Sequence, residues 1–147
     1  MDLDALASIL RGYLQSLRRM SGNRCDFWSY AIDLDGGIDG SIDSIIAGTD
    51  VRISDSAPAG YKEVDVLLDR YVFPMLNVAD EDLCKLFAWD IVEYIEICCR
   101  ELDPLSTPLS RREAMMFAGS SSFHSTLAYL VVPIKSRALV IALGARA

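Results

Sequence analysis

Long apolar runs are missing from this sequence, although 52% of its 147 residues are hydrophobic. Charged residues interrupt every apolar stretch well before the ~18 residues that a membrane-spanning helix requires. The chain starts MDLDALASILRGYL, with acids where a secretory signal carries basic residues. We therefore expect a soluble protein that stays in the cytoplasm and has no membrane partner.

Signatures of common catalytic and cofactor sites are also missing. The sequence has no Rossmann glycine pattern, no P-loop, no HExxH and no GxSxG elbow. Its cysteines, Cys25, Cys84, Cys98 and Cys99, have no CxxC spacing and are predicted to be reduced and structural. The single histidine, His124, has no second metal ligand at the usual spacing. These patterns predict no metal, no cofactor and no catalytic residue, and they leave open whether the protein is an enzyme.

Charge of one sign dominates the middle of the chain. The net charge of −7 divides into +2 over residues 1–24, −13 over residues 25–103 and +4 over residues 104–147. An acidic field of this kind repels nucleic acid and attracts cationic partners. A basic patch with interleaved aromatic residues, which nucleic-acid binding requires, is also missing. We predict a basic protein partner and no nucleic-acid partner.

The length fits one domain over residues 1–147, built around a single hydrophobic core. Apolar residues at helical spacing predict helices over residues 3–20, 62–73 and 79–103, and shorter ones over 42–47 and 111–118. Runs rich in β-branched and aromatic residues predict strands over 26–34, 51–54, 123–132 and 137–143. The serine, proline and glycine content of residues 54–60 is typical of a linker.

The two C-terminal strands are nearly all apolar, which is typical of central strands covered on both faces. We predict an α+β fold with a small, mostly antiparallel sheet. The sheet combines the N-terminal strands, at its edges, with the C-terminal hairpin. Three to four helices cover it, the longest of them over about residues 79–103.

The helix predicted over residues 79–103 has a very wide apolar sector, which includes Leu86 and Ile97. Its polar ridge is narrow and carries Glu93 and Glu96. Trp89 lies in the middle of this ridge, at about 240° on the helical wheel. An indole at that position is either covered by another segment or available to a partner. Both interpretations stay open at this point.

An acidic loop over residues 33–55 contains six aspartates against the single Arg52. Asp35, Asp39, Gly40 and Asp43 occupy positions 1, 5, 6 and 9 of an EF-hand register. The register fails at positions 3 and 12, where glycine and isoleucine replace two of the usual ligands. The loop is therefore predicted to be a solvated surface that attracts cations, without a calcium site.

The favoured functional hypothesis is a non-catalytic, acidic protein-binding domain. A concrete version is a bacterial immunity-like or antitoxin-like inhibitor that masks a basic toxin or nuclease. The predicted partner-binding residues are Trp89, Asp33, Asp35, Asp39, Asp43, Glu93 and Glu96. One alternative is an enzyme or small-ligand-binding domain with a site around His124 and the 33–55 loop. Another is a subunit that associates with itself, as a homodimer, through the apolar hairpin.

Overall fold

The computed structural model describes residues 2–35, 37–59, 86, 90, 93–97, 100–103 and 114–147. They include two helices, α1 (Leu3–Met20) and α2 (Ile38–Ile46). They also include five strands, β1 (Cys25–Asp33), β2 (Arg52–Pro58), β3 (Met115–Ser120), β4 (His124–Ile134) and β5 (Arg137–Arg146). Residues 86, 90, 93–97 and 100–102 are helical as well. The predicted α+β fold is confirmed.

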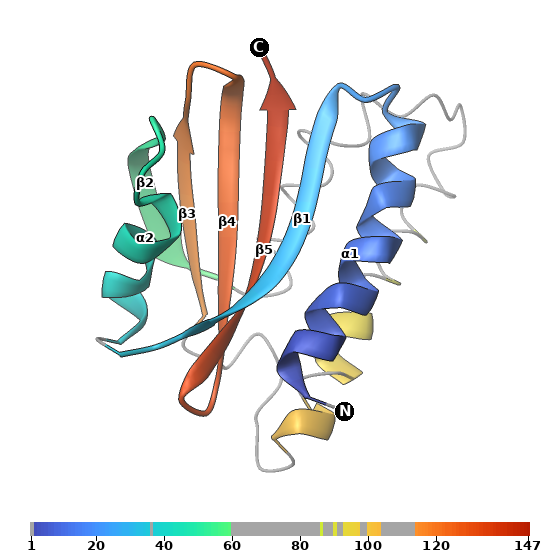
Figure 1. Cartoon of the computed structure of the whole chain (residues 1–147), viewed down its shortest axis with the longest axis vertical. Helices are drawn as coiled ribbons and strands as arrows, with labels where there is room; N and C mark the ends of the chain where they lie inside the picture. The colour runs from blue at the N-terminus through green and yellow to red at the C-terminus, as the bar shows by residue number, and fades with distance from the viewer. Residues whose placement is uncertain are drawn as a thin grey trace.

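The five strands form one antiparallel sheet in the order β1-β5-β4-β3-β2 (Figure 1). The C-terminal hairpin β4-β5 lies at its centre, and the N-terminal strands β1 and β2 form its two edges, as predicted. This order follows from the residues. Most of β4 and β5 is buried, whereas nearly every residue of β2 is exposed.

One face of the sheet is covered by α1. The Asp2 side chain caps this helix by accepting a hydrogen bond from the backbone N–H of Ala5 at 2.7 Å. Its buried stripe consists of Leu3, Leu6, Ala7, Leu10, Leu14 and Leu17. These residues share a core with Phe27 of β1, Leu139 of β5 and Ile95. The helical residues around Ile95 therefore cover the same face as α1.

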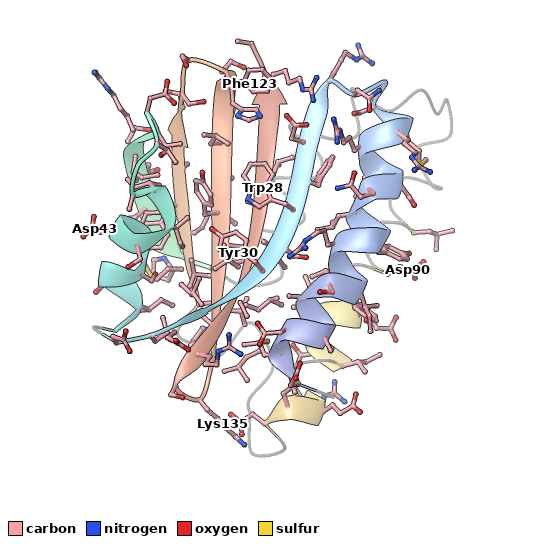
Figure 2. The ribbon with its side chains drawn as sticks, viewed as in Figure 1. Trp28, Tyr30, Asp43, Asp90, Phe123 and Lys135 are labelled. Atoms are coloured by element: carbon pink, nitrogen blue, oxygen red, sulfur yellow. The ribbon has the colours of Figure 1, made fainter. Side chains whose placement is uncertain are left out.

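The opposite face has a second core, to which α2 contributes Ile42 beside Phe117 of β3. Figure 1 shows α2 next to β2 and β3, at the far edge of the sheet from α1. Trp28 and Tyr30 of β1 pair with Ala142 and Val140 of β5, respectively. Figure 2 shows both aromatic side chains lying across the sheet on this face. Large side chains of an edge strand thus cover the small residues of the strand beside it.

Three sequence predictions differ from the structure. Residues 115–118, predicted as part of a helix over 111–118, belong to strand β3. Residues 54–58, predicted as a linker, belong to β2, which pairs with β3. The short helix predicted over 42–47 is α2, which starts four residues earlier at Ile38. The helix predicted over 62–73 lies outside the described residues.

The described residues of the predicted helix 79–103 are helical up to residue 102, but the helix presents a different side to solvent than expected. Leu86 and Ile97, predicted in the apolar sector, are 61% and 50% exposed. Glu96, predicted on the polar ridge, is only 4% exposed. The buried side therefore runs through Ile95 and Glu96.

Candidate functional sites

Exposed apolar side chains gather on one helical surface. Five large hydrophobic side chains are exposed among the described residues, namely Ile9, Tyr13, Leu86, Ile97 and Phe123. The first two lie one turn apart on α1, and the next two lie on the helical residues of 86–102. We call these four residues the helical patch. Clustered apolar exposure of this kind is typical of protein-binding surfaces.

Two acidic residues lie between the apolar residues Leu86 and Ile97 of the helical patch. Leu86, Asp90, Glu93 and Ile97 are separated by four, three and four residues, and all four side chains are exposed. This spacing places them along one side of a helix. Neither acid has an ion pair with another described residue. Arg100 follows one turn after Ile97 and is also exposed.

Aromatic stacking joins the two halves of the helical patch. The rings of Tyr13 and Tyr94 are nearly parallel, at 7°, with their centroids 6.5 Å apart. Burial raises the pKa of Tyr13, and the nearby Asp90 carboxylate adds to this increase. Figure 2 shows Asp90 beside α1. The stack therefore joins α1 to the helical residues of 86–102, and the helical patch spans both segments.

A second exposed acidic surface lies on α2. Asp39 and Asp43 are four residues apart in this helix, and Asp35 precedes it. All three are exposed and have no ion pair with another described residue. Figure 2 shows Asp43 pointing away from the sheet. Because residues 38–46 are helical, the EF-hand register cannot fold as a calcium loop. In the described part of the chain, no group of His, Cys, Asp and Glu is arranged to hold a metal ion.

Other acids are paired within the protein. Asp33, at the end of β1, lies 3.1 Å from Nε of Arg137, whose Nη1 lies 2.9 Å from Asp4. Hydrogen bonds from Arg137 lower the pKa of Asp4. These two acids join the start of α1 to the β4-β5 turn. Asp33 therefore has a structural partner, unlike the acids of α2.

A polar cluster lies at the other end of β1, where three strands meet. The Asp26 cluster consists of Asp26, His124, Arg146 and Arg18. Arg146 donates two hydrogen bonds to the Asp26 carboxylate, at 2.9 and 3.0 Å, and Nε2 of His124 lies 2.7 Å from Oδ2. Nε of Arg18 lies 3.4 Å from Oδ1. The hydrogen bonds from Arg146, then those involving His124, hold the pKa of Asp26 below its ordinary value of 3.8.

Gly144 is required for the position of His124. A Cβ atom at residue 144 would lie 2.6 Å from Cδ2 of the His124 ring. The ring of Phe123 packs against that of His124 at a centroid distance of 4.9 Å, and Arg146 lies 5.3 Å above the Phe123 ring. Packing thus holds the imidazole over β5.

The contacts of the Asp26 cluster indicate a structural role and not a catalytic one. A Ser-His-Asp arrangement needs a serine hydroxyl at the free nitrogen of the imidazole. The neighbouring hydroxyls of Ser121 and Ser125 bond instead to backbone groups. The predicted combination of His124 with the acids of the 33–55 loop is represented among the described contacts by one bond, which joins Asp50 to Ser122, two residues before His124. Asp50 accepts a hydrogen bond from the backbone N–H of Ser122 at 3.0 Å, whereas Asp33 lies roughly 23 Å from Asp26, seven strand residues away.

The six predicted partner-binding residues that the structure describes fall into three groups. Asp35, Asp39, Asp43 and Glu93 are exposed, Asp33 is paired with Arg137, and Glu96 is buried. Trp89 lies outside the described residues, as do Cys84, Cys98 and Cys99, whereas Cys25 is buried. Burial raises the pKa of the Cys25 thiol. The sequence analysis missed the apolar members of the helical patch, because their helical spacing is equally typical of buried residues.

Comparison with known proteins finds no similar protein. The chain matches no protein-family model, and no curated protein or solved structure shows significant similarity to it. No helix in the described ranges is both long enough and apolar enough to cross a membrane. Functional inference therefore depends on the surfaces described above.

Proposed function

We propose that this chain is a non-catalytic protein-binding domain that captures a basic protein through its acidic surface. The observation that carries the proposal is the division between paired and unpaired acids. The acids at the ends of β1 bond to arginines of the same chain. Asp39, Asp43, Asp90 and Glu93 are exposed and have no ion pair within the described residues. Acids that are not paired with a described base of the same chain are available to a cationic partner.

A specific form of this function is inhibition of a basic bacterial toxin or nuclease, in the manner of an immunity protein or antitoxin. An enzyme that acts on nucleic acid carries a cationic active site, because its substrate is a polyanion. An acidic domain can cover that site by complementary charge, and long-range attraction accelerates the encounter. Such an inhibitor needs no catalytic group of its own.

The test begins with the immobilised chain and an extract of the cells that produce it. We expect a basic protein to bind in a 1:1 ratio at low salt and to elute as salt increases. When purified, this protein should lose activity on nucleic acid upon stoichiometric addition of the chain. An affinity that does not respond to salt would contradict capture by charge.

Paired charge variants provide the matched control. Asp39→Asn with Asp43→Asn removes two unpaired acids and should slow association roughly three- to tenfold at low salt. Asp4→Asn with Asp33→Asn changes the net charge equally, but it removes acids that both bond to Arg137. This second pair should change the association rate much less. Equal effects of both pairs would show that only net charge matters.

A further inference from the structure

We propose that the helical patch of Ile9, Tyr13, Leu86 and Ile97 is the docking surface for an amphipathic α-helix of a basic partner. This inference rests on the proposed function and adds the location of the contact and the chemistry of the partner. It depends on the exposed apolar residues and on the acids between them, both of which occur on the described residues of the two helices.

The dimensions of the helical patch fit a helix. Residues 86 and 97 are eleven positions apart, which corresponds to about 16 Å or three helical turns. Their four-three-four spacing with Asp90 and Glu93 is that of a single seam between packed helices. Ile9 and Tyr13 add a second row, because they lie one turn apart on α1. Two parallel rows of side chains are the surface that an amphipathic helix packs against.

Charge selects a basic partner over a second copy of the chain. In an antiparallel pair of copies centred on the seam, Asp90 of one copy would face Glu93 of the other. Both contacts in such a dimer would join like charges, which destabilise an interface. Lysine or arginine residues flanking an apolar stripe would instead pair with both acids. Among the described residues of 86–102, the one exposed base is Arg100, which lies beyond Ile97.

Binding at the helical patch should depend on the helical periodicity of the partner sequence and not only on its composition. A helix that places leucine on one side and lysine at its borders satisfies both the apolar residues and the acids. A chain of the same composition without helical periodicity can satisfy only the acids. This difference separates docking from non-specific attraction.

The test uses a synthetic peptide of about 14 leucine and lysine residues, in which the leucines recur at helical spacing. A scrambled peptide of identical composition is the control probe. Fluorescence titration should show that the amphipathic peptide binds the intact chain at least about tenfold more tightly than the scrambled one. Leu86→Ser with Ile97→Ser should abolish this difference. Phe123→Ser, which removes a side chain that is 59% exposed outside the patch, should preserve it.

Charge reversal provides a second test that leaves the apolar residues in place. Asp90→Lys with Glu93→Lys should weaken binding of the leucine-lysine peptide and strengthen binding of a leucine-glutamate peptide. Equal binding of the amphipathic and scrambled peptides would overturn the docking surface while leaving capture of a basic protein intact. A wild-type dimer that Leu86→Ser with Ile97→Ser dissociates would also overturn it, because the occupant would be a second copy.

Discussion

At the scale of single residues, Asp26 has the densest set of polar contacts among the described side chains. Its carboxylate accepts bonds from Arg146 on β5, contacts His124 on β4 and lies near Arg18 on α1. Only 16% of its side chain is exposed. Hydrogen bonds to a charged group are stronger than neutral ones and stronger still away from water. This residue therefore ties the ends of four elements together.

We predict that Asp26→Asn lowers the free energy of unfolding by about 1–3 kcal/mol at neutral pH. The folded pKa of Asp26 lies below its ordinary value of 3.8. Its ionised form therefore stabilises the fold fully above about pH 4, and this contribution is lost as the pH falls through the folded pKa. Urea unfolding of the wild type and the variant between pH 7 and pH 2 measures the effect. The two curves should converge at the acidic end.

The matched control is Asp4→Asn, which removes an exposed acid also bonded to an arginine. Exposed ion pairs contribute little to stability, because water screens them. This variant should leave the unfolding curve close to that of the wild type at every pH. A loss of stability in Asp26→Asn that is independent of pH would show that the charge is not the cause.

At the scale of elements, each edge of the sheet is protected against pairing with another chain. Along β1, residues 25, 27 and 29 direct their backbone groups away from β5, given the hydrogen-bonded register. Side chains of α1 and its C-cap bond to all three. Arg11 donates to the Ser29 carbonyl, Gln15 donates to the Phe27 carbonyl, and the Ser21 hydroxyl accepts from the Cys25 N–H.

The other edge, β2, is protected by its own residues. The bond from the Ala59 N–H to the Ala114 carbonyl sets the register, in which Ser56 and Pro58 direct their backbone groups outward. The Ser56 N–H bonds to the Asp55 carboxylate at 2.9 Å, and Pro58 has no N–H. A bulge between Ile53 and Asp55 interrupts the rest of the edge. These are recognised means of preventing edge-to-edge aggregation.

We predict that Asp55→Thr with Pro58→Val converts β2 into a competent pairing edge. The first change frees the Ser56 N–H, the second restores a donor, and both new side chains favour strands. Sedimentation should show concentration-dependent association of the variant, with the wild type as reference. Ser54→Thr is the control, because it leaves both protective features in place. A variant that sediments as the wild type does would show that other residues block the edge.

The same elements show how far the sequence determines the structure. The spacing of α1 and the apolar composition of β4 and β5 predict their position correctly, because burial dictates both patterns. Residues 115–118 were wrongly predicted to be helical, since Met and Ala favour helices locally. Their true signal is alternation, as Met116 and Phe117 face different cores. Pairing with β2 and β4, which are distant in sequence, overrides the local preference.

The candidate sites were less predictable. The apolar sector of the helix over 79–103 is so wide that the sequence alone does not determine which side is buried. The rotation of this helix about its own axis determines which side is buried. In the structure Leu86 and Ile97 are exposed and Glu96 is buried. The Asp26 cluster joins residues about 100 positions apart, with no local motif. Its assembly depends on the strand order, which the sequence predicts only in outline.

At the scale of the whole molecule, the acids divide into internal pairs and an exposed set. Arg146 and Arg18 lie against Asp26 at one end of β1, and Arg137 pairs with Asp33 at the other. The unpaired acids lie on α2 and on the helical residues of 86–102, over opposite faces of the sheet. An approaching cationic protein therefore experiences attraction from a large part of the surface. With the proposed docking at the helical patch, the acids of α2 would act on the partner at a distance.

The final prediction separates this electrostatic role from stability. Asp43 lies in the second half of α2, whose last turn has no basic residue, so its negative charge adds to the negative end of the helix dipole. Asp43→Lys removes this repulsion and places a lysine four residues after Asp39, the favourable order for a helical ion pair, worth roughly 0.3–0.5 kcal/mol. Thermal unfolding should therefore show a small increase in the midpoint. Stopped-flow association with the leucine-lysine peptide at low salt should be slower than for the wild type, with Asp43→Asn between the two. A variant that is more stable but slower to bind indicates that Asp43 serves attraction of the partner rather than folding. Loss of stability would assign Asp43 a structural role. An unchanged association rate at low salt would remove α2 from the attracting surface.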